Sequence, residues 1–92
     1  MYKVVLSRRY KTVLKRYSRR NDFSHETLKE IIRTLARGEK LEQRYQDHQL
    51  SGELQEYREC HIKHNLLLTY QKHENVLVLL LINLGTHDDL FR

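Results

Sequence analysis

A run of seven consecutive aliphatic residues, 76–82, constrains the fold of this 92-residue chain more than any other feature. The run is far shorter than the roughly 20 residues that a helix needs to cross a bilayer, so we expect no membrane span. It suits a strand that is apolar on both faces, central in a sheet and covered by helices. At this length the chain supports one small core, and we expect a single domain over residues 1–92.

The first half of the chain predicts a strand followed by two amphipathic helices. Residues 2–6 fit a short strand, and Ser7 suits the N-cap of a helix whose apolar residues recur every three to four positions. Ser24 is expected to cap a second helix, which Gly38 would end in a left-handed conformation. Residues 40–52 are polar and rich in turn formers, so we expect an irregular surface connection there.

The second half changes to a period of two and predicts three strands, at about 54–62, 65–71 and 75–84. Short turns between them require antiparallel pairing. After the last strand, Thr86 can cap a helical turn with Asp89 three residues on. The expected class is α+β: an N-terminal strand and two helices, an antiparallel three-stranded meander and a short C-terminal helical turn.

Charge is unevenly distributed along the chain. Residues 1–46 hold 13 basic and 5 acidic residues, a net +8, whereas residues 47–92 hold 4 basic and 7 acidic, a net −3. Such an unmixed basic surface favours binding to a polyanion or an acidic partner over a merely solvated face. The candidate contact residues lie on the first helix: Arg8, Arg9, Lys11, Lys15, Arg16, Arg19 and Arg20.

A single cysteine, Cys60, excludes an internal disulfide framework, and the chain does not open like a signal peptide. We therefore expect the reducing cytoplasm. Cys60 alternates with Ile62 and reads as a core thiol rather than a nucleophile. The serines look like caps or turn residues, which argues against a serine hydrolase.

Histidines carry the candidate chemistry. Among six, His25 and His73 are expected at exposed positions without a role, whereas His48, His61 and His87 could converge on one rim of the sheet. The spacing shows neither a helical pair of histidines nor a pair of cysteines, so we predict no metal site and no cofactor. General acid–base chemistry remains, and it suits RNA because the 2′-hydroxyl is the substrate's own nucleophile.

At these positions the sequence resembles the YafQ branch of the RelE/ParE superfamily of bacterial toxins, which cleave mRNA on the ribosome. The similarity extends over nearly the whole chain. Its matching segments are 47–52 (DHQLSG), 57–62 (YRECHI), 66–70 (LLLTY) and 84–91 (LGTHDDLF).

The resemblance implies a RelE-like fold and a metal-independent endoribonuclease. It implies that His48, His61 and His87 are catalytic, with His87 donating a proton to the leaving oxygen and Phe91 near the substrate base. Arg58 is then expected to clamp a phosphate. The implied partners are a cognate antitoxin, mRNA and the ribosome, with operator DNA reached only through the antitoxin complex.

One position departs from the family pattern: shortly after the residue equivalent to His61, these toxins usually carry a catalytic aspartate, where this chain has His64-Asn65. Three explanations are open. His48 or His61 is the base and Asn65 orients substrate, which we favour; His64 has taken over; or the enzyme is slow or altered in specificity.

Three classes of function are therefore compared: a ribosome-dependent endoribonuclease toxin, a ParE-like toxin that acts on DNA gyrase without cleaving RNA, and a nucleic-acid-binding module. Only the first needs three aligned histidines.

Overall fold

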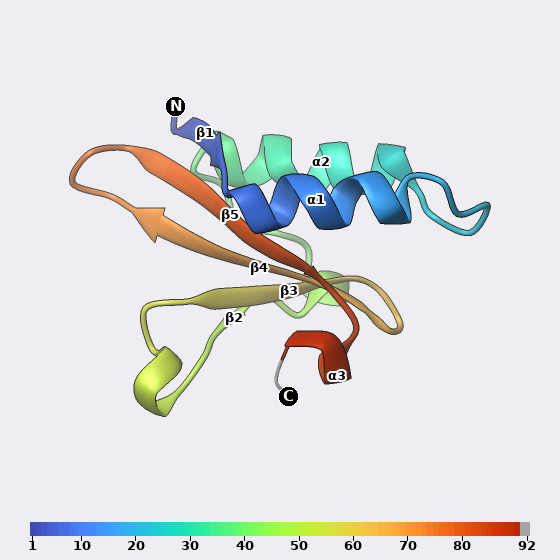
Figure 1. The fold of residues 1–92 in the computed structure, drawn as a ribbon. Coiled ribbons are helices and arrows are strands. Elements are labelled where there is room, and N and C mark those ends of the chain that lie inside the picture. Colours follow the sequence, from blue (N-terminus) through green and yellow to red (C-terminus); the bar gives the residue numbers. More distant parts are fainter. Residues whose placement is uncertain (91–92) are drawn as a thin grey trace.

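The computed structural model describes residues 1–90, in which two helices pack on one face of a five-stranded sheet (Figure 1). This α+β arrangement confirms the predicted class. The strands are β1 (Lys3–Leu6), β2 (His48–Gln49), β3 (Arg58–Lys63), β4 (Leu66–His73) and β5 (Val78–Gly85). The helices are α1 (Arg8–Tyr17), α2 (His25–Ala36) and the short α3 (His87–Leu90), with 3-10 turns η1 (Gln43–Tyr45) and η2 (Gly52–Leu54).

Local capping chemistry starts both long helices where the sequence predicts. The Ser7 side chain accepts a hydrogen bond from the backbone N–H of Tyr10, and that of Ser24 accepts one from Thr27. Gly38 follows α2 with a φ of 77°, a left-handed conformation that glycine adopts without strain.

The sheet has the strand order β1-β5-β4-β3-β2. The predicted meander is confirmed, since β3, β4 and β5 pair antiparallel, and β1 adds to β5 in parallel. The aliphatic run lies in an interior strand, as expected, but β5 begins only at Val78. Val76 and Leu77 lie in the preceding turn, 63% and 49% exposed, because the chain reverses there through a left-handed Leu77 (φ 54°).

The connection at 40–52 differs from the irregular loop that was expected. It contains the edge strand β2 and the turn η1, whose Tyr45 is buried in the core. The next strand was predicted from residue 54 but begins at Arg58, because residues 52–54 form η2, which begins with the left-handed Gly52 (φ 67°).

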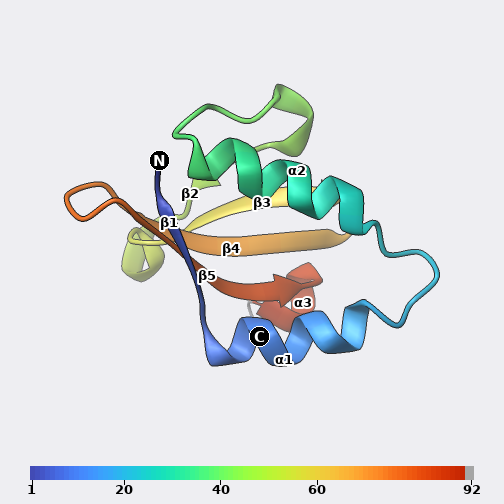
Figure 2. The same ribbon diagram turned by 90° about the horizontal axis from the view of Figure 1, so that it is seen from above.

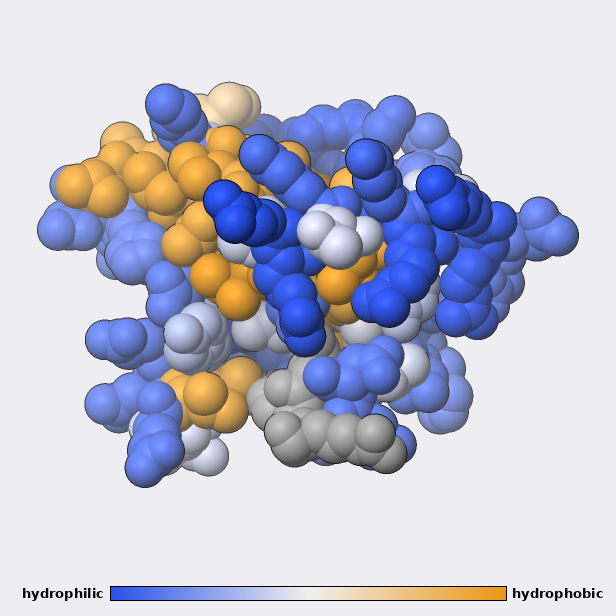
Figure 3. All heavy atoms as spheres, viewed as in Figure 1, coloured by the Kyte–Doolittle hydropathy of each residue, from blue (hydrophilic) through white to orange (hydrophobic). Residues whose placement is uncertain are grey.

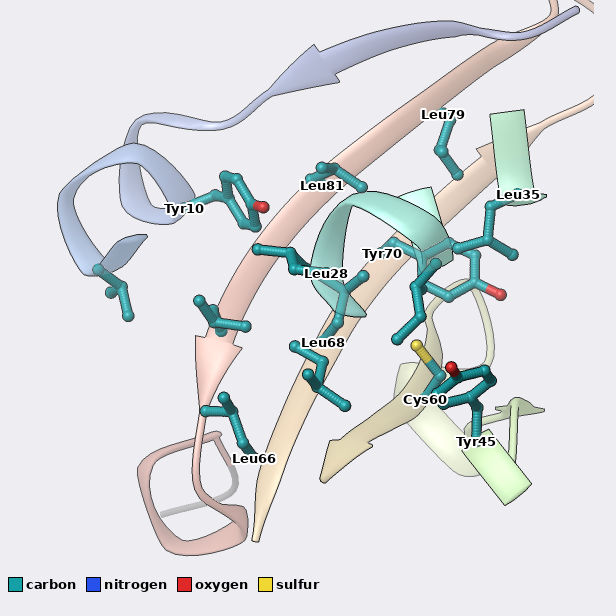
Figure 4. Close-up of a cluster of buried hydrophobic side chains, with 14 of the residues drawn as sticks. Tyr10, Leu28, Leu35, Tyr45, Cys60, Leu66, Leu68, Tyr70, Leu79 and Leu81 are labelled. Atoms are coloured by element: carbon teal, nitrogen blue, oxygen red, sulfur yellow. The ribbon is translucent and has the colours of Figure 1, made fainter. Parts of the chain in front are cut away.

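Both long helices cover the same face of the sheet, with α2 against β3 and α1 beside β5 (Figure 2). Figure 4 shows the core between them, where Tyr10, Leu28, Leu68 and Tyr70 converge. We call this the helix face; α3 lies on the opposite, open face (Figure 1). Within residues 1–90, none of the helices combines the length and apolar character of a membrane span.

Candidate active site

A histidine and a buried carboxylate meet where β2 pairs with β3. The register places His48 directly opposite Glu59, and His48 Nε2 lies 3.4 Å from Glu59 Oε1. The other ring nitrogen of His48, Nδ1, lies 2.7 Å from the backbone oxygen of Gln46. The Glu59 side chain is 6% exposed and that of His48 is 48% exposed. The carboxylate is therefore shielded, while the imidazole is open to a ligand.

Both ring nitrogens of His48 face oxygen atoms, which fixes the orientation of the ring. Glu59 provides one of these oxygens from the open face of the sheet. Its second oxygen, Oε2, and the hydroxyl of the cross-strand neighbour Thr69 are buried with no hydrogen-bond partner among the described residues. Glu59 was not predicted as a site residue, although two-residue spacing along a strand puts it on the same face as His61.

His61 follows Glu59 by two residues and therefore lies on the same face of β3. It is a diagonal neighbour of His48, a geometry with about 7–8 Å between such positions. Across the sheet His61 pairs with Leu67, which pairs in turn with Gly85, two strand spacings or about 10 Å away. These cross-strand pairs therefore lead from His61 to the end of β5.

His87 begins α3, two residues beyond Gly85. The predicted capping box is present: the Thr86 N–H donates to Asp89 Oδ2 (3.3 Å), and the Asp89 N–H donates to Thr86 Oγ1 (3.2 Å). The backbone N–H of Thr86, followed by its hydroxyl, lowers the pKa of the Asp89 carboxyl. Tyr17 of α1 also donates to that carboxylate at 3.4 Å, so two elements fix the turn that carries His87.

Arg58, expected to clamp a phosphate, lies on the helix face and is not brought together with the histidines. Its guanidinium donates to Asp47 at 3.0 Å and to the Tyr70 hydroxyl at 3.2 Å. Partial burial lowers the pKa of Arg58, but these two partners outweigh it and raise the pKa overall. Arg58 therefore has two intramolecular partners, and its side chain, 34% exposed, also lines a hollow of about 400 Å³ on the helix face, away from the histidines.

His64 and Asn65 form the exposed turn between β3 and β4, beyond His61. His64 shares with His61 the lining of a hollow of about 270 Å³. Asn65 borders a smaller hollow of about 160 Å³ together with Thr86. His64 therefore lies beside His61, whereas none of the three candidate catalytic histidines lines the hollow at Asn65. The predicted base contact Phe91 lies outside the described residues.

The basic side chains of α1 and of the segment after it are exposed, and hydrophilic residues dominate this part of the surface (Figure 3). Among the described residues 1–90, Arg20 is the one predicted contact residue of the seven that forms an ion pair, with Asp22 at 3.1 Å. Cys60 is fully buried, as expected, and burial raises the pKa of its thiol. In residues 1–90, no three His, Cys, Asp or Glu side chains are grouped to hold a metal ion.

Comparison with known proteins identifies the family. Residues 2–92 match the model of the bacterial toxin of type II toxin–antitoxin systems, YafQ. The chain belongs to the YafQ toxin family. As a YafQ-family toxin it is 36% identical to a metal-bound toxin from Helicobacter pylori, over 99% of this chain and 100% of that one, with a TM-score of 0.91.

Two further structures resemble this YafQ-family toxin. A copper-bound mutant toxin from Helicobacter pylori is 35% identical over 99% of this chain and 100% of that one, with a TM-score of 0.92. YafQ in the E. coli DinJ-YafQ complex is 24% identical over the full length of both chains, with a TM-score of 0.88, which shows a shared fold. Comparison with curated protein sequences finds no match.

Proposed function

We propose that this protein is the toxin of a type II toxin–antitoxin pair and an endoribonuclease that cleaves mRNA on the ribosome in the cytoplasm. The observation that carries the proposal is the open-face site: a histidine held by a buried carboxylate, a second histidine beside it, and a third on a capped turn across the sheet. Three imidazoles at one surface suit proton transfer to and from an RNA phosphodiester.

His61 is the best candidate for the base that removes the proton from the 2′-hydroxyl. It is half-buried on the open face, and within residues 1–90 no carboxylate forms an ion pair with it. His48, by contrast, has its Nε2 3.4 Å from Glu59 Oε1, so in its protonated form it is paired with that carboxylate. A cation there neutralises the charge that builds on the phosphate as the 2′-oxygen attacks.

His87 then donates a proton to the departing 5′-oxygen, so that a 2′,3′-cyclic phosphate and a 5′-hydroxyl form. Its exposed position on α3 leaves room for a substrate strand that crosses the open face from β2. A base that must be unprotonated and an acid that must be protonated give a bell-shaped dependence of rate on pH. No metal ion or cofactor has a step in this scheme.

The antitoxin is the second part of the proposal. An E. coli relative is described in complex with DinJ. On this chain the basic α1 adjoins β1, whose Val4, Val5 and Leu6 are 36–38% exposed. A surface that is apolar and positively charged side by side suits an acidic, amphipathic segment that folds on binding.

The test uses a synthetic mRNA in a purified translation system, with cleavage mapped by primer extension. His61→Ala and His87→Ala should each reduce the rate by roughly 100- to 10,000-fold. A single 2′-deoxynucleotide on the 5′ side of the cut should abolish cleavage there, because the nucleophile is gone. Free RNA assayed in parallel measures the ribosome requirement.

His25→Ala and His73→Ala are matched controls, since both histidines are exposed and lie on α2 and at the end of β4. They should cleave at the wild-type rate. Undiminished cleavage by His87→Ala, or cutting of the 2′-deoxy substrate, would contradict the mechanism. Inhibition of DNA gyrase without RNA cleavage would support the ParE-like alternative instead.

A further inference from the structure

Two pairs of consecutive residues, Asp47-His48 and Arg58-Glu59, contact each other on both faces of the sheet. On the open face His48 meets Glu59 at 3.4 Å. On the helix face the preceding residue of each pair does the same, because Arg58 donates to Asp47 Oδ2 at 3.0 Å. Successive side chains point to opposite faces, so the same stretch of chain is held from both sides.

Tyr70 completes the contact on the helix face. Its hydroxyl donates to Asp47 Oδ1 at 2.5 Å and accepts from Arg58 Nε at 3.2 Å. Tyr70 is fully buried in β4, in the core beneath Leu35 (Figure 4). Burial, and then the hydrogen bond to Asp47, raise the pKa of Tyr70, so its hydroxyl remains a donor. We call Asp47, Arg58 and Tyr70 the anchor.

His48 needs such support because the strand that carries it is minimal. β2 has two residues, both exposed, and pairs with β3 at two positions only. The chain enters β2 through Gln46, a non-glycine residue in the left-handed region with a φ of 48°. A two-residue edge strand after such a turn has little backbone pairing to keep it in register. The anchor joins it to β4, inside the sheet.

We propose that Asp47, Arg58 and Tyr70 are positioning residues that hold β2 in register and thereby orient His48 toward Glu59 and the substrate. Arg58 then contacts Asp47 and Tyr70 and not RNA, which replaces the phosphate clamp expected from the sequence. The catalytic consequence of this inference rests on the proposed function. The geometric consequence does not, because it concerns only where the His48 ring lies.

The first experiment follows the histidines of full-length protein by NMR, with the rings isotopically labelled. Asp47→Asn and Arg58→Lys keep side-chain size while weakening the anchor, and thermal unfolding verifies that each variant is folded. The ring signals of His48 should shift or broaden in both variants, whereas those of His25 and His73 should remain in place. Tyr70→Phe, which removes only the hydroxyl, should give the same result. It provides the test if Asp47→Asn or Arg58→Lys does not fold.

The second experiment measures RNA cleavage by the same variants. Misplacement of a reacting group lowers turnover, so kcat should fall roughly 10- to 100-fold while KM stays within about twofold. Arg58→Lys should retain more activity than Arg58→Ala, because lysine can still donate to Asp47. Arg37→Ala is the matched control: it breaks an exposed arginine–carboxylate pair with Glu39 (3.1 Å) and should leave kcat unchanged.

A phosphate clamp gives a different pattern. Arg58→Ala would raise KM, and Asp47→Asn would leave cleavage intact; that result would overturn the inference. Unchanged His48 signals in folded Asp47→Asn and Tyr70→Phe would also overturn it, whatever the activity. If wild-type protein fails to cut RNA, the proposed function fails, and the NMR result still decides whether the anchor orients His48.

Discussion

Thr86→Ala separates the stability of the turn that carries His87 from the stability of the fold. The substitution removes the hydroxyl that accepts the Asp89 N–H at 3.2 Å. Loss of an N-cap side chain typically costs about 0.5–2 kcal/mol of helix stability. α3 has four residues, too few to be stable without its cap and its contacts to the rest of the protein.

A cost of about 1 kcal/mol changes the ratio of closed to open turn by roughly fivefold. If His87 acts from the closed turn, kcat for RNA cleavage should fall about two- to fivefold, and amide hydrogen exchange across residues 87–90 should accelerate to a similar extent. Global unfolding should change little, since the turn lies at the end of the chain and outside the core cluster. Thr86→Ser keeps the hydroxyl and should restore both measurements.

Ser24→Ala is the matched control, because it removes the equivalent cap from the twelve-residue α2. Here about 1 kcal/mol is lost from the fold itself, so Tm should fall by roughly 4–8 °C with kcat unchanged at a temperature where the protein is folded. Equal losses of Tm in the two variants, with normal cleavage by Thr86→Ala, would refute the reasoning.

Three further outcomes follow from the same geometry. Leu67 and Leu68 are both buried but on opposite faces, so Leu67→Ala and Leu68→Ala should each lower the free energy of unfolding by about 2–5 kcal/mol in urea titrations. Only Leu67→Ala, on the open face between His61 and Gly85, should also slow cleavage per folded molecule. Slower cleavage by Leu68→Ala and normal cleavage by Leu67→Ala would contradict the assignment of the two residues to these faces. Since the folded-state pKa of Asp89 is lowered, its contribution to the turn should be present above its unfolded pKa near 3.8 and disappear as the pH falls through the lower folded value. Carboxyl NMR should show this low titration in wild type and a higher one in Thr86→Ala. Asn65→Asp should change the maximal cleavage rate less than about threefold if His61 is the base; a rise above tenfold would show that the family carboxylate was missing.

Features set by near neighbours were predictable from the sequence. The caps at Ser7, Ser24 and Thr86 lie where the sequence analysis placed them, because a side-chain oxygen and an N–H three residues on are enough to define a helix start. The antiparallel meander followed equally from short turns and alternation. Both depend on interactions within a few residues of chain.

The strand β2 could not be predicted in the same way. Its two residues are both exposed and show no alternation, and its pairing depends on β3, nine or more residues away. Because residues 48–49 were predicted to be part of a loop, a contact between His48 and Glu59 was not expected. Glu59 was therefore not predicted as a site residue. Arg58 is the converse case: it lies on the helix face, as Cys60 does, and only the family resemblance suggested a phosphate contact.

Asn65, which stands where the family usually has a catalytic aspartate, affects the proposed mechanism less than the sequence suggested. A carboxylate is present on the open face, at Glu59, but its side chain is buried and directed at His48. A shielded carboxylate cannot take a proton from substrate directly, but in the proposed mechanism it is the partner of the His48 ring when that ring is protonated. With His48 paired to Glu59 and His87 as the proposed acid, the proposed base is His61. Asn65, exposed beside the hollow that Thr86 borders, then needs only to donate or accept a hydrogen bond, which an amide does.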